Sequence, residues 1–445
     1  MRAAIDGTGG KRMIHRAAPA ALAFVLLAGV SEAASRPSFE DLVANLKSHN
    51  AGTRRDAAAE LGRSRRREAV TPLAALVRDP DAKVRLEVVR ALRELRDLSA
   101  VPAIVTSLSD GEPQIREEAI GSLVEIYADR DRGNPVGRFL ELFSDEFDRS
   151  SLAAHGSVDS SVIQALAAKL ADEDKDIRQE AAYALGILNG TEALPALTNS
   201  LRDPEASVRG AAATSIGKIG TAENGRALVP LLSDDSTNVR NRVLQAIGVL
   251  RVREAGPALR QLYEANRRKE GGPRILAALS RIGDPAQADL FQELVQDPDP
   301  ERKRLAIEGL GRISDASRLP AFKKDYQREK NEELRLAYSF ALVLLGDRAF
   351  LDTIVLSLPS RTLGTRSRSY LQEMGPAILP ELYPYLNDPE AEIRATLCDI
   401  IASFGDPEAI PRLTPLINDP SQTVADKANR AVERLRRTGA AKASR

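Results

Sequence analysis

Apolar residues recur along most of the chain at spacings of four, four and three residues. Such spacings place the apolar side chains on one face of an α-helix and leave the opposite face polar. The pattern therefore predicts a long series of amphipathic helices. Clear examples are Val84, Val88, Leu92 and Leu95; Ile177, Ala181, Leu185 and Leu188; and Ile393, Leu397, Ile401 and Phe404.

A basic residue occupies a fixed place near the start of these helices. Arginine stands at positions 54, 85 and 116 and again at 178, 209 and 240, with a step of 31 within each triple and 62 between them. We call this position the anchor of a repeat. Aspartate lies six residues before most anchors, as Asp203 does before Arg209, and proline often follows it. A fixed period of this length is typical of repeat proteins.

Each repeat also carries the signals of a second, shorter helix. Glycine with Asp and Pro ends the first helix, as in Gly283-Asp284-Pro285 and Gly405-Asp406-Pro407. A proline 17 residues after the anchor then suits the first turn of a new helix, at Pro102, Pro195, Pro257 and Pro411. Two helices about every 31 residues predict an all-α fold, an α-solenoid or superhelix of stacked hairpins.

The repeat resembles a known family at the level of its motif. The segment Asp203-Pro204, Val208-Arg209, Ala212 and Ser215-Ile216-Gly217 is similar to the short HEAT repeat of the phycobilisome-lyase type. This resemblance implies about twelve two-helix HEAT units over residues 34–437, of which those anchored at Gly272 and Gly364 are degenerate. We place their anchors at positions 54, 85, 116, 178, 209, 240, 272, 303, 335, 364, 394 and 425.

The aspartate and arginine columns admit two interpretations. They form either a charged strip for a ligand or a ladder in which Asp accepts from backbone N–H groups and Arg donates to Asp of its own or the next unit. The ladder is favoured, because stacking residues must recur in every unit whereas a binding site need not.

The N-terminus has the features of an export signal. A basic segment with Lys11, Arg12 and Arg16 precedes an apolar run over 17–30, and Ser31-Glu32-Ala33 supplies small residues for cleavage. This order predicts a signal peptide over residues 1–33, cleaved after Ala33, and a periplasmic or secreted protein. The alternatives are a buried helix or a start site placed too early. The apolar run is too short to cross a bilayer as a helix, and no later stretch predicts a transmembrane segment.

The repeat pattern is interrupted over residues 129–160. Phe139, Phe143 and Phe147 lie there at helical spacing. The stripe predicts either an extra helix that packs on neighbouring units, which we favour, or an exposed helix that binds a partner.

Basic clusters mark both ends of the repeat region. They comprise Arg65, Arg66 and Arg67 in the first unit and a tail over residues 438–445. They predict either solvated caps of the end repeats or contacts with an anionic surface.

Composition argues against several classes of function. The chain has 63 Lys and Arg against 63 Asp and Glu, whereas proteins that bind nucleic acid usually carry a basic excess. Its soft metal ligands are His15, His49, His155 and Cys398, far apart in sequence, so we expect no metal and no organic cofactor. No spacing typical of a catalytic group is present, and we expect no enzymatic activity.

These observations predict a non-catalytic exported scaffold or adaptor. A protein or peptide partner would bind along the concave face, which we expect to be lined mainly by the second helices. The alternative is an accessory subunit of an enzyme that matures a cofactor protein, resembling a bilin lyase or a chaperone.

Overall fold

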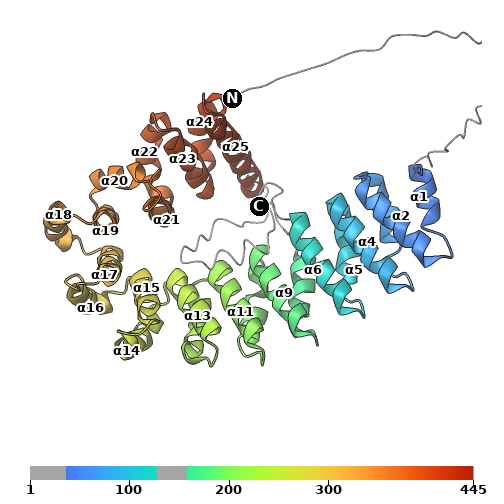
Figure 1. Cartoon of the computed structure of the whole chain (residues 1–445), viewed down its shortest axis with the longest axis horizontal. Coiled ribbons are helices and arrows are strands. Elements are labelled where there is room, and N and C mark those ends of the chain that lie inside the picture. The colour runs from blue at the N-terminus through green and yellow to red at the C-terminus, as the bar shows by residue number, and fades with distance from the viewer. Residues whose placement is uncertain (1–36, 128–157, 444–445) are drawn as a thin grey trace, which may run out of the picture.

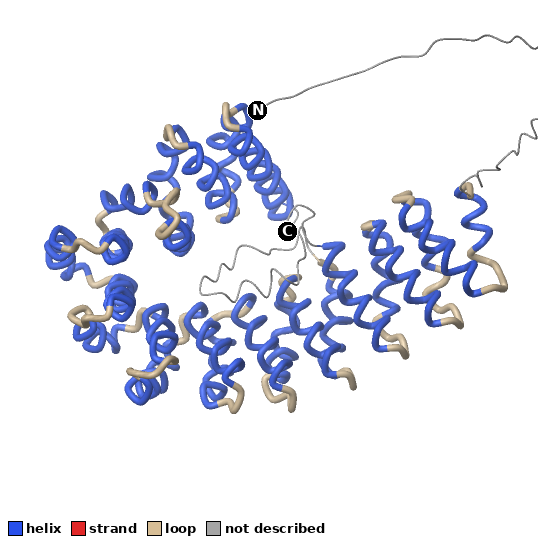
Figure 2. The backbone as a smooth tube through the Cα atoms, viewed as in Figure 1, coloured by secondary structure: helices blue, strands red, loops and turns tan. Residues whose placement is uncertain are grey.

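The computed structural model describes residues 37–127 and 158–443, which form an open arc of helical hairpins (Figure 1). All regular elements within these two ranges are helices (Figure 2), so the prediction of an all-α solenoid is confirmed. Residues 1–33, where the signal peptide is predicted, lie outside the described residues.

Each of the twelve anchor positions falls within a helix of the described ranges, and we call these the first helices. Six of them are capped at the N-terminus by a polar side chain, as in α4, where Asp81 accepts from the backbone N–H of Val84 at 3.2 Å. The first helices are α2 (Ala51–Arg63), α4 (Ala82–Leu95), α6 (Pro113–Tyr127), α9 (Lys175–Ile187), α11 (Ala206–Ile219), α13 (Thr237–Leu250), α15 (Gly272–Ile282), α17 (Pro300–Ile313), α19 (Glu332–Leu344), α21 (Gly364–Met374), α23 (Ala391–Ser403) and α25 (Gln422–Ala443).

The second helices are shorter, and several are completed by 3-10 turns. The proline signals are confirmed, because Pro102, Pro195, Pro257 and Pro411 each lie in the first turn of a second helix or next to its start. These helices are α1 (Phe39–Asn45), α3 (Val70–Ala74), α5 (Val101–Ser107), α8 (Ser160–Ala168), α10 (Leu194–Ser200), α12 (Ala222–Gly225), α14 (Gly256–Asn266), α16 (Ala288–Leu294), α18 (Leu319–Arg328), α20 (Leu351–Leu356), α22 (Leu379–Leu382) and α24 (Ile410–Leu413).

The concave face is lined by the first helices. Figure 1 shows α15, α17, α19 and α21 on the inside of the arc and α14, α16, α18 and α20 on the outside. The expectation that the second helices line this face is therefore wrong. The physical reason is that successive first helices pack closely. In a curved stack, the layer with the shorter spacing between its helices lies on the inside.

Glycine permits this close packing at a repeated position eight residues after the anchor. A Cβ added at Gly62, Gly217 or Gly311 would lie 2.7 Å from an atom of an alanine in the next first helix. Such distances are too short for two carbon atoms, so a larger residue would push the helices apart.

The buried side chains form two groups that meet at α19. The first group extends from Leu42 to Leu345 and the second from Leu336 to Leu435. Tyr338 belongs to the first group and Phe340 to the second, so the two faces of α19 serve different halves of the solenoid.

The interruption lies inside one repeat unit. Helix α6 ends at Tyr127, and the second helix of the same unit, α8, begins at Ser160. Residues 128–157 between them lie outside the described residues. At the other end, α25 continues to Ala443, so residues 438–443 of the predicted basic tail extend a helix.

Candidate functional site

The regular spacing of Asp and Arg produces a ladder of clamps between units. Arg209 donates from Nε and Nη2 to both carboxylate oxygens of Asp234 in the next unit, at 2.7 and 2.9 Å. Its Nη1 donates at 2.9 Å to the carbonyl oxygen of Asp203 in its own unit. Asp203 in turn accepts from the backbone N–H of Glu205 at 2.9 Å. Equivalent two-pronged pairs join Arg54 to Asp79, Arg85 to Asp110, Arg178 to Asp203 and Arg394 to Asp419.

This geometry supports the ladder interpretation of the two columns. Each arginine is engaged by a carboxylate and a carbonyl of the fold itself, which fixes how one hairpin sits on the next. The guanidinium group next to an aspartate also shifts the pKa of its carboxyl group. In Asp234, the hydrogen bonds from Arg209 lower that pKa.

One clamp closes across the interruption. Arg116 of α6 donates from Nη2 to Asp172 at 2.7 Å, although the two residues are 56 positions apart. Both side chains are only 5% exposed. Helix α6 therefore stacks directly against α9, the first helix of the next unit, as first helices do where the chain is uninterrupted.

The ladder is incomplete in the second half of the arc. Anchors 272 and 364 are glycines, and the guanidinium of Arg335 lies over the ring of Tyr326, 4.6 Å from its centroid. Arg240 donates to the carbonyl oxygens of Asp234 and Asp235 in the preceding loop. In this region Lys303 replaces arginine and donates to Glu329 at 2.8 Å.

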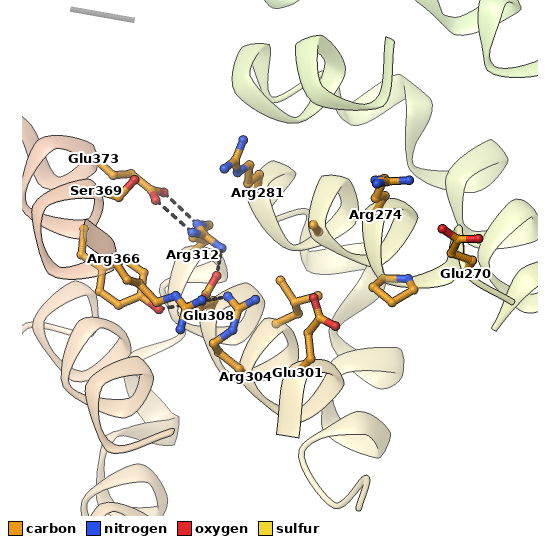
Figure 3. Close-up of a pocket in the computed structure, with 14 residues that line it drawn as sticks. Glu270, Arg274, Arg281, Glu301, Arg304, Glu308, Arg312, Arg366, Ser369 and Glu373 are labelled. Atoms are coloured by element: carbon orange, nitrogen blue, oxygen red, sulfur yellow. Dashed lines mark hydrogen bonds and ion pairs between the residues drawn. The ribbon is translucent and has the colours of Figure 1, made fainter. Parts of the chain in front are cut away.

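A cavity of about 370 Å³ opens on the concave face where this ladder is incomplete. Three first helices, α15, α17 and α21, supply most of its wall (Figure 3). Its lining comprises Glu270, Pro273, Arg274, Ala277, Arg281, Glu301, Arg304, Leu305, Glu308, Arg312, Arg366, Ser369, Tyr370 and Glu373. We treat this cavity as the candidate functional site, because convergent charged groups in a concavity are typical of binding sites.

A buried carboxylate lies at the floor of the cavity. Glu308 is only 4% exposed. Its Oε1 accepts from Arg304 Nη1 at 2.5 Å and from the Tyr370 hydroxyl at 2.6 Å, and its Oε2 accepts from Arg312 Nη1 at 3.3 Å. The carboxylate is thus held by two guanidinium groups and one phenol, as Figure 3 shows for the arginines.

Arg312 joins Glu308 to a second carboxylate on α21. Its Nε and Nη2 donate to the two oxygens of Glu373 at 2.7 and 2.9 Å, and its Nη1 also donates to Ser280 Oγ at 2.8 Å. Arg251, at the end of α13, donates to Glu373 at 3.0 Å. These bonds connect α21 directly to α13 and α17, without passing through α19.

The charges in this network perturb one another strongly. Burial alone would raise the pKa of Glu308, but the adjacent Arg304 and Arg312 and the bond from Tyr370 lower it to about 2. Burial raises the pKa of Tyr370 well above its ordinary value, and the charge of Glu308 adds to that effect. For Arg281, burial and then the neighbouring charge of Arg312 lower the pKa. All of these groups keep their ordinary charge near neutral pH, so the cavity contains fixed charges.

Of the residues singled out from the sequence, the structure describes Arg65, Arg66 and Arg67, and none of them lines this cavity. Phe139, Phe143 and Phe147 lie outside the described residues. Arg65 adopts the left-handed conformation (φ 52°) in the loop after α2. The guanidinium of Arg66 lies 4.0 Å from the ring centroid of Phe39, and Arg67 Nε lies 2.8 Å from Asp97 Oδ2. A binding role for these residues stays a prediction.

The cavity residues were missed because they do not form a column along the whole chain. They share only a set of positions relative to the anchor of their unit. Arg304 lies one residue after it, Arg274 two, Glu308 five, and Arg281 and Arg312 nine. These are the positions that face the concavity. A comparison of inward positions between units would have shown that charge gathers in neighbouring repeats.

The remaining metal-binding and nucleophilic side chains do not cluster in the described ranges. No group of three or more His, Cys, Asp and Glu side chains in residues 37–127 and 158–443 is placed to hold a metal ion. Burial raises the pKa of the Cys398 thiol to about 12. Among the helices described, none combines the length and the apolar character that a membrane span requires.

Comparisons with known proteins concern the fold. The family model of HEAT repeats matches residues 39–124, 143–217, 194–271 and 379–443, which is more than half of the chain. A comparison with curated proteins finds no match.

Three of the solved structures that match this chain are aligned over more than half of both chains. An engineered protein is 18% identical, with 89% of this chain and 98% of that chain covered and a TM-score of 0.35. The complex of CpcE and CpcF of phycocyanin lyase from Nostoc sp. PCC7120 is 21% identical, with 65% and 98% covered and a TM-score of 0.30. YibA of Escherichia coli is 17% identical, with 62% and 92% covered and a TM-score of 0.41. None of these similarities bears on function.

Proposed function

Because the chain belongs to the family of HEAT-repeat proteins, we propose that it is an exported, non-catalytic scaffold that binds a protein or peptide partner along its concave face. Stacked repeats of this kind suit extended contacts with another chain, since every unit presents a similar surface. The observation that carries the proposal is the charged cavity between α15, α17 and α21, where three repeats converge on a hollow of the inner face.

The location of the protein rests on the N-terminal sequence. The basic lead, the apolar run over 17–30 and the small residues before Ala34 have the order of a signal peptide. Fractionation of the native cells and N-terminal sequencing of the purified protein test this directly. A mature chain that begins at Ala34 in the periplasmic or secreted fraction supports export, and an intact Met1 in the cytoplasm refutes it.

Site-specific crosslinking tests the concave face. A photoreactive residue replaces Glu270 or Glu301, two exposed residues that line the cavity. The matched controls carry it at Arg202 or Arg328, exposed residues at or just after the ends of the second helices α10 and α18. The proposal predicts that both inner positions capture the same protein from the native envelope and that the outer positions do not. Capture from the outer positions alone refutes it.

The identity of the captured protein also bears on the alternative from the sequence. A partner that carries a covalently bound chromophore or another cofactor would favour an accessory subunit of a maturation enzyme. A partner without one would favour the scaffold.

A further inference from the structure

The charges that line the cavity fall into two overlapping sets, with Arg304 in both. Glu308 and Glu373 are already held inside the wall by Arg304, Arg312 and Arg251. Arg312 makes bonds through Nε, Nη1 and Nη2, so its donors are directed at the fold itself. This set holds α21 against α13 and α17.

The second set of charges has hydrogen-bonding capacity left. A guanidinium group has five N–H donors. Arg304 directs one bond at Glu308, and Arg366 makes one long contact, 3.5 Å from its Nη1 to Glu333 Oε2. Within the described residues, Arg274 lies exposed at the opening and takes part in no ion pair. Figure 3 shows Arg304 of α17 and Arg366 of α21 on one side of the hollow and Arg274 of α15 on the other.

We propose that this cavity binds the carboxylate of an acidic side chain of the partner, with Arg304 and Arg366 as its hydrogen-bond donors and Arg274 as a positive charge at the opening. The inference rests on the proposed function, since it names the chemistry by which the partner is recognised. Arginine suits this role, because its planar fork matches the two oxygens of a carboxylate.

The charge balance selects a carboxylate over more highly charged ligands. The lining contains five arginines and four glutamates, an excess of one positive charge. A side chain with a single negative charge neutralises that excess, whereas a phosphate group or a polyanion would meet Glu270 and Glu301 at the rim.

The uncharged part of the lining suits the rest of such a side chain. Pro273, Ala277 and Leu305 offer apolar contacts to its methylene groups. Ser369 adds a hydroxyl on the α21 side. The cavity thus combines donors for a carboxylate with a surface for the short aliphatic stem that carries it.

A peptide-display selection tests the inference and needs no identified partner. The purified protein is used to enrich peptides from a random library, and the selected sequences are compared with those selected by an Arg274→Ala/Arg366→Ala variant. These substitutions leave the bonds among Glu308, Arg312, Tyr370 and Glu373 in place. The matched control is Arg202→Ala/Arg328→Ala, which removes the same charge from exposed positions outside the cavity.

The selected peptides should share one acidic position. Exchange of that Glu or Asp for Gln or Asn should weaken binding to the wild type and to the control at least about tenfold in a fluorescence-polarisation titration, the loss expected for a hydrogen bond to a charged group. The same exchange should weaken binding to the double variant several-fold less, because Arg274 and Arg366 are gone and Arg304 alone remains as a donor.

Other outcomes separate the two levels of the argument. Peptides that bind without a shared acidic position, or whose acidic residue matters equally to the double variant, overturn the carboxylate site and leave the scaffold proposal standing. Failure of the wild type to enrich any peptide overturns the carboxylate site, whereas the scaffold proposal is decided by the crosslinking experiment.

Discussion

The substitution Glu308→Gln tests the electrostatic network of the cavity wall. It keeps the size of the side chain but removes the negative charge between Arg304 and Arg312, and it turns an N–H donor toward one of these donors. Because the pKa of Glu308 falls from 4.5 to about 2 on folding, the ionised carboxylate stabilises the fold by about 3 kcal/mol. Loss of one member of a buried ion pair costs a similar amount, about 3–5 kcal/mol.

The stabilisation depends on pH in a definite direction. A carboxyl group whose pKa is lowered by folding stabilises the protein above its unfolded pKa, and the effect is lost as pH falls through its folded pKa. The difference between wild type and Glu308→Gln should therefore be close to its full value at pH 5 and above. It should shrink to about 1 kcal/mol by pH 3, where the folded pKa of about 2 is approached.

Hydrogen exchange is the suitable measurement, because a repeat array opens locally and has no single unfolding free energy. Backbone amides of α17 and α21 should exchange faster in the variant at neutral pH, and amides of α2 and α4 should not change. Glu333→Gln is the matched control, since that carboxylate is 53% exposed and lies 3.5 Å from Arg366, and it should cost less than about 1 kcal/mol. An equal effect of both substitutions, or a Glu308→Gln effect that does not change between pH 7 and pH 3, would refute the reasoning.

Three further substitutions test the packing between units. Gly217→Ala places a Cβ 2.7 Å from an alanine Cβ of α13 and should destabilise the protein by about 1–3 kcal/mol in thermal unfolding. Its control, Gly121→Ala, meets no described atom within 4 Å and should stabilise the protein by about 0.5–1 kcal/mol, so the same sign for both would contradict the packing described. Leu185→Ala removes a fully buried side chain and should cost about 2–5 kcal/mol, against less than about 1 kcal/mol for the exposed Arg66→Ala, and comparable losses would mean that the repeat register is wrong. Arg116→Met should open α6 and α9 locally by about 3 kcal/mol in hydrogen exchange, and unchanged protection there would show that this clamp does not join the two hairpins.

The sequence was sufficient to predict the fold because the residues that stack the helices recur in most units. The spacing of apolar residues, the proline at the second helix and the Asp–Arg pair recur at one period, and each has one local physical meaning. The match to HEAT repeats confirms the resemblance drawn from Asp203 and Arg209. The layer that faces inward was predicted wrongly, because the curvature depends on helix spacing at Gly62, Gly217 and Gly311, which only the packed structure displays.

The site was harder to predict for a different reason. Glu308 and Glu373 look like surface residues in a helical pattern, since charged residues alternate with apolar ones throughout the chain. Glu308 is buried because α21 contacts α17 across one intervening unit, where the Tyr370 hydroxyl donates to Glu308, 62 positions away. No periodicity encodes a contact of this range, so the sequence directed attention to the phenylalanine stripe and to Arg65–Arg67.

The incomplete ladder and the cavity occur in the same part of the chain, and the first explains the second. Where Arg54, Arg85, Arg116, Arg178 and Arg209 clamp successive units, each hairpin is fixed to its neighbour on the same geometry. At anchors 272 and 364 glycine removes that constraint, and the arc in Figure 1 turns more tightly there. The tighter turn brings α21 toward α13 and α17, and the charges on their inward positions then meet. The cavity is thus formed where the repeat departs from its regular geometry, and the charged inward positions of α15, α17 and α21 line it.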